Sequence, residues 1–545
     1  MTNDALRDIR TRGTRTPQRA QADPRQEKNS AGGYVFVTDG ETRIRRFLTM
    51  GTYGTFYVNT RDTTADNGGV LLDWAKNRSS RLVELAAEIS VAGRAPRNGP
   101  ALLALAAALS LGDVEGRRAA ALALPSVART GSHLETLAGY AEQFGGWGPV
   151  TRRAFASWYL DKDPDRLAYQ LIKYRRRGGG DHAWSHADIL KMAHPKPRTA
   201  DGTLMTEHDA LFGWLCGKGI RDDGLPKWVV AYRRAQEIAH STGSPAAKYV
   251  ALIGEYPGLP WEALGDEATG QADVWRALID AGMPVTALIR NLPKMTRLGV
   301  LAPMSSHLRA VCEQLADADA LKRQRVHPVA ILVAAKVYAS GRSEKGTSTW
   351  TPVPQVTDAL SRAFYLAFPA VEPAGKRTMV ALDVSGSMTS SAAGYCLSAR
   401  EVVAAMALVT MNTEPSWGVY GFSTQFMPLQ LSPGMRLDTA ARYMAGLPYG
   451  GTDCSLPMRW ALANRVEVDT FQVWSDYETW AGSEHAYEAL RNYRQGMGIG
   501  ARMQTVMVTP TKFTLANPDD AGTLDVSGFD SDVPVLLANH ARGDI

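Results

Sequence analysis

Five oxygen-bearing side chains in the last third of the chain could together hold a hard cation. Asp383, Ser385 and Ser387 alternate along one loop after an apolar run, Thr452 lies in a glycine-containing turn, and Asp476 follows a later apolar run. If these runs are parallel strands, their carboxyl ends meet at one sheet edge, where such folds bind ligands. Two carboxylates and three hydroxyls form the all-oxygen ligand set that suits Mg²⁺, with Mn²⁺ as the alternative.

Two other interpretations of these residues stay open. Each motif alone could be a turn that caps a helix. A metal-dependent phosphohydrolase would also use an aspartate after the first strand, but that chemistry usually needs a second acid two residues on, and position 385 is serine. We find no nucleophile elbow, Walker loop or zinc-protease motif, so the sequence favours a binding protein and we expect no catalytic residues.

A second candidate site lies where basic and aromatic residues gather. Residues 151–200 contain eleven Lys and Arg against five Asp. Basic side chains can neutralise phosphates, and aromatic rings can stack on unpaired bases. A solvated helix end with a glycine cap explains the same composition, so that alternative stays open. The residues that we expect to contact RNA are Lys173, Arg175, Arg177, His186 and His194.

The two histidines belong to one predicted helix. Ser185 and Asp188 have the spacing of a capping box, and Pro195 cannot continue a helix, so His194 should end it. A rise of about 1.5 Å per residue separates the histidines by about 12 Å, which is too far for one metal site. A helix-end cap is an equally good role for His186.

Charge is divided unevenly along the 545 residues. The net charge is +5, yet residues 371–545 hold 12 basic and 18 acidic residues, so residues 1–370 carry a net +11. A polyanion would therefore approach the first two-thirds, and a cation would suit the last third. With 45% hydrophobic and 21% charged residues, the composition is that of a folded globular protein.

The elements that position these residues fall into three segments. Residues 1–28 are polar and Arg-rich, which predicts a flexible basic arm. Residues 29–367 repeat apolar positions at three-to-four spacing between Gly and Pro turns, which predicts an irregular array of helical repeats. Residues 368–545 alternate apolar strands with helices, which predicts a doubly wound, mostly parallel α/β domain.

Segments that would place the chain in a membrane or outside the cell are missing from the sequence. The longest apolar run, residues 100–112, is shorter than the about 20 residues of a membrane span. The first residues contain no apolar signal core, so we expect a cytoplasmic protein. The four cysteines form no CxxC pair, which argues against zinc.

The two halves together resemble the Ro autoantigen family, in which a TROVE module precedes a von Willebrand factor A-like (vWA) domain. The matching stretches cover nearly the whole chain: residues 29–34, 46–48, 184–186, 193–197, 286–292, 294–296, 325–328, 371–377, 450–458, 517–520 and 528–530. The resemblance implies that HEAT-like repeats close into a ring that the vWA domain completes. It also implies a metal-ion-dependent adhesion site with Asp383, Ser385, Ser387, Thr452 and Asp476 as ligands, directly or through water.

The resemblance further implies the partners. Family members bind Y-type small RNAs on the outer surface and single-stranded 3′ ends of misfolded noncoding RNA in the central cavity, for RNA quality control and stress recovery. Bacterial relatives are linked through a Y RNA to polynucleotide phosphorylase. Lys173, Arg177 and His194 match family positions associated with RNA. Residues 178–183 lengthen the usual spacing, and a metal-dependent protein-interaction scaffold remains the alternative function.

Overall fold

The computed structural model describes residues 15–51, 60–95, 97–174, 184–218, 224–241, 245–344, 346–368, 371–390, 396–448, 450–509 and 511–545. Helices dominate as far as residue 366, and a six-stranded sheet with its helices follows. This is the predicted order of a helical array and an α/β domain. No helix in the described ranges is both long and apolar enough to cross a membrane.

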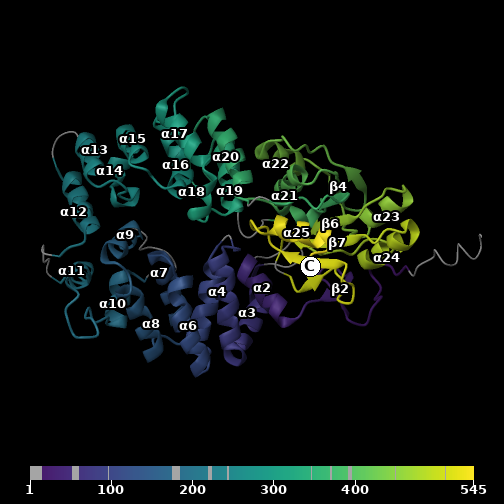
Figure 1. The fold of residues 1–545 in the computed structure, drawn as a ribbon, viewed down its shortest axis with the longest axis horizontal. Helices are drawn as coiled ribbons and strands as arrows, with labels where there is room; N and C mark the ends of the chain where they lie inside the picture. The colour runs from purple at the N-terminus through teal and green to yellow at the C-terminus, as the bar shows by residue number, and fades with distance from the viewer. Residues whose placement is uncertain are drawn as a thin grey trace, which may run out of the picture.

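The helical part is a curved array whose neighbouring helices pack against one another (Figure 1). Early in the array α4 contacts α5 and α6, α5 contacts α7, and α6 contacts α8, a pattern typical of stacked helical repeats. The helices are α2 (Gly40–Met50), α3 (Thr60–Asn77), α4 (Ser79–Ala92), α5 (Gly99–Leu111), α6 (Val114–Val127), α7 (Gly131–Gln143), α8 (Pro149–Leu160), α9 (Pro164–Tyr174), α10 (His186–Ala193), α11 (Thr206–Leu215), α12 (Lys227–Ala239), α13 (Pro245–Glu255), α14 (Asp266–Thr269), α15 (Ala272–Asp280), α16 (Val285–Arg297), α17 (Ser306–Leu315), α18 (Ala318–Arg323), α19 (Pro328–Ser340) and α20 (Pro354–Leu366), with the 3-10 turn η2 (Trp261–Ala263).

The helices of the array bury one another, and α5 shows this most clearly. Helix α5 is built almost entirely from Ala and Leu, and its residues Ala104 to Ala108 are fully buried. A helix that is apolar on all sides cannot be stable at a surface. Its neighbours α4, α6 and α7 cover it. Each helical layer therefore gains its stability from the layers beside it.

The α/β domain has the sheet order β5-β4-β3-β6-β7-β9, in which β4, β3, β6, β7 and β9 are parallel and β5 is antiparallel. Because β3 is central, its carboxyl end lies between the loops that follow β4 and β6. The elements are β3 (Thr378–Asp383), η3 (Gly386–Thr389), α21 (Ala399–Thr413), β4 (Trp417–Phe422), β5 (Phe426–Pro428), α22 (Leu437–Ala445), α23 (Leu456–Ala463), β6 (Thr470–Ser475), α24 (Ala486–Met497), β7 (Arg502–Met507), β8 (Phe513–Thr514), β9 (Thr523–Ser527) and α25 (Val533–Arg542).

The α/β domain contacts both ends of the helical array and so closes a ring (Figure 1). At the first end, the buried guanidinium of Arg46 in α2 pairs with Asp525 of β9 at 2.5 Å. At the last end, Lys336 of α19 pairs with Glu401 of α21 at 2.6 Å. The predicted fold class, a helical-repeat ring joined to a vWA-like domain, is confirmed.

The N-terminal segment differs from the expected flexible arm. Residues 15–28 pack on the α/β domain, with Gln18 and Gln26 buried. Strand β1 (Gln26–Lys28) pairs with β2 (Tyr34–Val37), and β2 pairs with β8. We call residues 15–37 the N-terminal strap. The arm prediction is therefore wrong for residues 15–28, because several of their partners, such as Gly482 and Glu488, lie more than 400 positions away and local sequence cannot reveal them. Residues 1–14 lie outside the described residues.

Candidate functional sites

The structure brings all five predicted metal-binding residues to one edge of the sheet. Asp383 ends β3, Ser385 and Ser387 follow in its loop, Thr452 precedes α23, and Asp476 follows β6. Each is at most 2% exposed. Ser385 donates its backbone N–H to Asp383 Oδ1 at 2.8 Å, and the two serine hydroxyls lie 3.0 Å apart. The five residues thus lie on loops at one edge of the sheet, and their role as metal ligands stays a prediction.

The electrostatics of this edge suit a cation. Burial and the neighbouring charge of Asp476 raise the pKa of Asp383 to about 7, and burial also raises the pKa of Asp476. Thr452 Oγ1 and Asp476 Oδ2 are buried without a hydrogen-bond partner among the described residues. A divalent cation would offset the repulsion between the carboxylates and satisfy both oxygens. The residues present therefore fit such an ion.

The five oxygen donors of this candidate site differ from a metal site built from several His, Cys, Asp or Glu side chains. In the described ranges, no group of three or more His, Cys, Asp and Glu could hold a metal. The candidate site contains only two carboxylates, and its remaining oxygens are hydroxyls. Such a donor set provides weaker negative charge than three carboxylates, and it leaves room for water or an external ligand on the ion.

Two residues that the sequence analysis did not place in the site support its loops. Ser475 donates its hydroxyl to Asp383 Oδ2 at 2.6 Å. Arg400, buried on α21, donates to the backbone carbonyls of Val384 and Ser385 and to Leu447 O. Its guanidinium therefore holds the loop that follows β3 and carries Ser385 and Ser387. An arginine within an otherwise apolar helix was the signal available in the sequence, but it indicated no partner.

His186 lies in the core of the helical array and not on its surface. The side chain is buried, the Tyr159 hydroxyl is hydrogen-bonded to Nδ1 at 2.7 Å, and the ring stacks on Trp158. Burial lowers the pKa of His186 to about 3. The imidazole is therefore neutral and packed, and the expectation that it contacts RNA is wrong because no face is left for a ligand.

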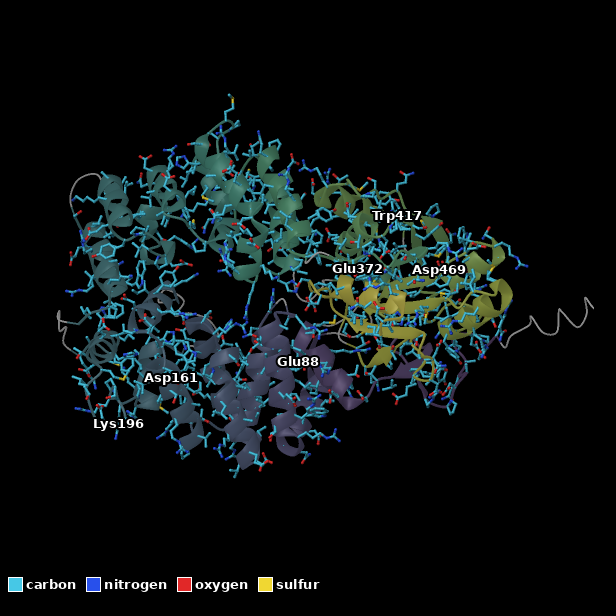
Figure 2. All side chains as sticks on the ribbon, in the orientation of Figure 1. Glu88, Asp161, Lys196, Glu372, Trp417 and Asp469 are labelled. Atoms are coloured by element: carbon cyan, nitrogen blue, oxygen red, sulfur yellow. The ribbon has the colours of Figure 1, made fainter. Side chains whose placement is uncertain are left out.

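His194 ends α10 as predicted, and it is exposed. Its backbone is left-handed, with φ of 49°, and its N–H donates to Leu190 O. With Lys191, Lys196 and Lys218 it lines a hollow of about 560 Å³ between α10 and α11. Figure 2 shows Lys196 on the outer side of the ring. The outer surface thus carries a concave basic site, which we call the basic hollow.

The other predicted RNA residues are only partly placed. Lys173 lies in the last turn of α9, with its Nζ 6.0 Å from the Tyr169 ring centre. Arg175 and Arg177 lie outside the described residues, as does the insertion at residues 178–183. The predicted capping box of Ser185 and Asp188 is present.

Basic residues also face one another from opposite limbs of the ring. Arg129 lies between α6 and α7, and Arg325 lies between α18 and α19, on the facing limb in Figure 1. Burial and repulsion from Arg325 lower the pKa of Arg129. The guanidinium of Arg129 donates to Ser90 and Ser126 and pairs with no described carboxylate. An anion between the limbs would be attracted to both residues.

A helical ring closed by a vWA domain with an oxygen-lined sheet edge defines a narrow class of protein. The family model described as TROVE domain matches residues 27–215 and 258–336, and the model described as Ro60 vWA domain matches residues 377–541. The chain belongs to the Ro family.

Two curated relatives and one solved structure extend this result. The chain is 40% identical to the RNA-binding protein RO60 of Deinococcus radiodurans, covering 97% of this chain and 98% of the relative. It is 32% identical to the RNA-binding protein RO60 of Caenorhabditis elegans, covering 95% and 90%. The crystal structure of the Deinococcus radiodurans RO (RSR) protein matches 93% of this chain and 100% of that chain, with a TM-score of 0.68 and 38% identity.

Proposed function

We propose that this protein is a ring-shaped RNA-binding protein of the cytoplasm that acts in noncoding-RNA quality control and the stress response, without catalysing a reaction. The observation that carries the proposal is the basic hollow. Lys191, Lys196 and Lys218 are exposed and line this hollow together with His194, against a single acidic residue, Asp209. The curated relatives are named RNA-binding proteins, which supports the same function.

The chemistry of the basic hollow fits an RNA nucleotide. Its volume of about 560 Å³ lies in the range of small-ligand sites. The lysines and His194 can contact phosphates, while Phe212 and Pro195 provide an apolar wall for a base. We assign the basic hollow to a structured, Y-type small RNA. Lys173, Arg175 and Arg177 stay predicted contacts of the same RNA on the strength of the sequence.

The facing limbs of the ring fit a second RNA element. A single strand passing between them would meet Arg129 and Arg325, and a duplex is wider than a single strand. We assign this inner region to the single-stranded 3′ ends of misfolded noncoding RNA. A structured RNA held outside could also tether polynucleotide phosphorylase to the ring.

The test measures RNA affinity by fluorescence anisotropy with a labelled hairpin RNA that carries no tail. A three-lysine variant should bind at least tenfold more weakly, because three phosphate contacts are lost. A control variant that removes the same charge from α3, α6 and α17 should bind like the wild type. Equal affinities of the two variants would contradict the assignment. The substitutions are Lys191→Ala, Lys196→Ala and Lys218→Ala, against Lys76→Ala, Arg118→Ala and Arg309→Ala.

A second variant tests the inner region. Arg129→Ala/Arg325→Ala should weaken binding of the same hairpin carrying a single-stranded 3′ tail, because the tail loses both guanidiniums. Binding of the tailless hairpin should stay unchanged. An equal loss of affinity for the tailed and the tailless hairpin would mean that the two arginines do not recognise the single-stranded tail.

We also propose that the vWA domain binds a divalent cation, Mg²⁺ or Mn²⁺, through Asp383, Ser385, Ser387, Thr452 and Asp476. The unpartnered Thr452 Oγ1 and Asp476 Oδ2 support this assignment. A bound ion would offer its open positions to an anionic oxygen. Mn²⁺ titration by calorimetry should give one site in the wild type and none in Asp383→Ala, and equal binding by both would contradict the assignment.

The same site supports the alternative function, a metal-dependent scaffold that captures an acidic residue of a partner protein. Chelation with EDTA separates the two functions. It should release a protein bound at the vWA domain, whereas RNA affinity at the basic hollow should not change. If chelation abolished hairpin binding, the metal site and the RNA surface would not be independent.

A further inference from the structure

One short motif near the N-terminus belongs to neither proposed site. Residues 29–34 read NSAGGY, yet they precede the helical ring and lie far in sequence from the vWA domain. In the structure this part of the N-terminal strap lies against the loop that follows β6, the loop that carries Asp476. The contact joins residues about 450 positions apart.

Asn29 makes the central contacts. Its side-chain NH₂ donates to Thr479 O at 2.7 Å and to Tyr477 O at 3.1 Å, and its Oδ1 accepts the Gly33 N–H at 2.8 Å. Ala31 donates its N–H to Glu478 Oε2 at 3.0 Å. The strap thus holds three consecutive residues after Asp476, and Asn29 itself is only 5% exposed.

The loop that Asn29 holds is strained. Tyr477 has φ of 62°, a left-handed conformation that costs about 1 kcal/mol or more for a residue with a bulky side chain. Such a conformation persists only when surrounding contacts fix it. The two carbonyls that Asn29 binds flank Glu478, so the strap fixes the backbone immediately after the metal ligand Asp476.

The strap packs closely against the loop that follows β6 at Gly33. A Cβ on Gly33 would lie 2.0 Å from Thr479 O, so only glycine fits there. The strap reaches the Thr452 loop as well. Arg19 lies 4.7 Å over the Trp480 ring, and the backbone N–H of Trp480 donates to Thr452 O at 3.1 Å. Both loops that supply ligands from outside β3 are therefore in contact with the strap or with residues it covers.

We propose that the N-terminal strap is part of the metal site, with Asn29 as the positioning residue that sets its cation affinity by fixing the Asp476 loop. This inference rests on the proposed binding of a divalent cation. Residues that orient metal ligands from the second layer typically change metal affinity about 10-fold to 100-fold when they are removed. The vWA domain without the strap would lack this support.

The experiment uses the full-length protein and Mn²⁺ alone, with calorimetric affinity as the readout. Asn29→Ala and Gly33→Ala should each bind Mn²⁺ about tenfold more weakly or worse than the wild type. Thr16→Val is the matched control, because Thr16 belongs to the strap but contacts Glu488 of α24 and not the metal loop. It should bind Mn²⁺ like the wild type.

Two further measurements distinguish positioning from general stability. The thermal midpoint is measured without metal, and a variant with a lower midpoint but unchanged Mn²⁺ affinity would overturn the inference. In the wild type, Mn²⁺ should slow hydrogen exchange at the amides of Ala31 and Gly33. This measurement does not need the Asn29→Ala variant, so it can be made even if that variant does not fold. Unchanged exchange in the metal-loaded wild type would also overturn it.

The outcomes separate this inference from the metal proposal. If the wild type binds Mn²⁺, Asp383→Ala does not, and Asn29→Ala binds like the wild type, the metal site stands and the role of the strap is refuted. If the wild type binds no Mn²⁺, both are refuted together.

Discussion

At the scale of single residues, His186 and His194 show how position on a helix decides the role of a side chain. His186 opens α10 and packs into the core against Trp158 and Tyr159. His194 closes the same helix and lies exposed in the basic hollow. The capping box and Pro195 predicted the ends of the helix. They did not predict which end faces solvent, because that depends on how α10 packs on α8.

Burial of a neutral His186 makes stability depend on pH. Its pKa is about 3 in the folded protein and 6.5 in an unfolded chain. As pH falls from 6.5 towards 3, the unfolded state binds a proton that the folded state does not, so folding is destabilised. Relative to His186→Gln, the wild type should lose up to about 1.4 kcal/mol of unfolding free energy per pH unit in this window. Urea titrations at several pH values measure this difference, and a pH-independent difference would contradict the buried, neutral state.

At the scale of elements, the alternation of strands and helices in the vWA domain followed from the sequence. Strand β3 contains the continuous apolar run Met379–Leu382, and β6 contains Phe471, Val473 and Trp474, so the local pattern indicates both buried strands. The strap was not predictable in this way. Strand β1 is only Gln26–Lys28 and has no apolar run, and it exists because β2 and β8 pair beside it. Asn29 and Arg400, which hold the loops after β6 and β3, were missed as well, because their partners lie in other parts of the chain.

The contact between α2 and β9 makes a prediction about ring closure. Arg46 is buried and pairs with Asp525, while its neighbour Arg45 pairs with Glu41 and Glu88 at the surface. Arg46→Ala would leave Asp525 without its partner and should cost about 3–5 kcal/mol. Arg45→Ala, the matched control, should cost about 1 kcal/mol or less. Urea midpoints measure both changes, and similar losses would show that the α2 contact does not stabilise the ring.

At the scale of the whole molecule, the charge division corresponds to two sites of opposite sign. The ring has basic residues on its outer side and between its limbs, and the vWA domain places two carboxylates in a buried edge. Sequence composition predicted this division, because net charge adds along the chain. It did not show that the strap packs against the loop that follows β6, because that contact joins residues about 450 positions apart.

Phosphate contacts should make RNA binding depend strongly on salt. The logarithm of the association constant should fall linearly with the logarithm of salt concentration, by about 0.7 to 0.9 for each phosphate neutralised. The three-lysine variant should therefore show a shallower slope than the wild type by about 2 to 3. Anisotropy titrations between about 50 and 200 mM salt measure both slopes. A slope near zero for the wild type would contradict phosphate-mediated binding.

The most direct test of the RNA-binding function is crosslinking of the protein to total small RNA, followed by sequencing. Wild type is compared with Lys173→Ala/Arg177→Ala/His194→Ala, which removes three of the residues that we expect to contact RNA. We expect the wild type to enrich a structured small RNA together with fragments that have single-stranded 3′ ends, and the variant to lose the structured RNA. If the wild type enriches neither over an unrelated control protein, the basic surface does not bind RNA and the account is wrong.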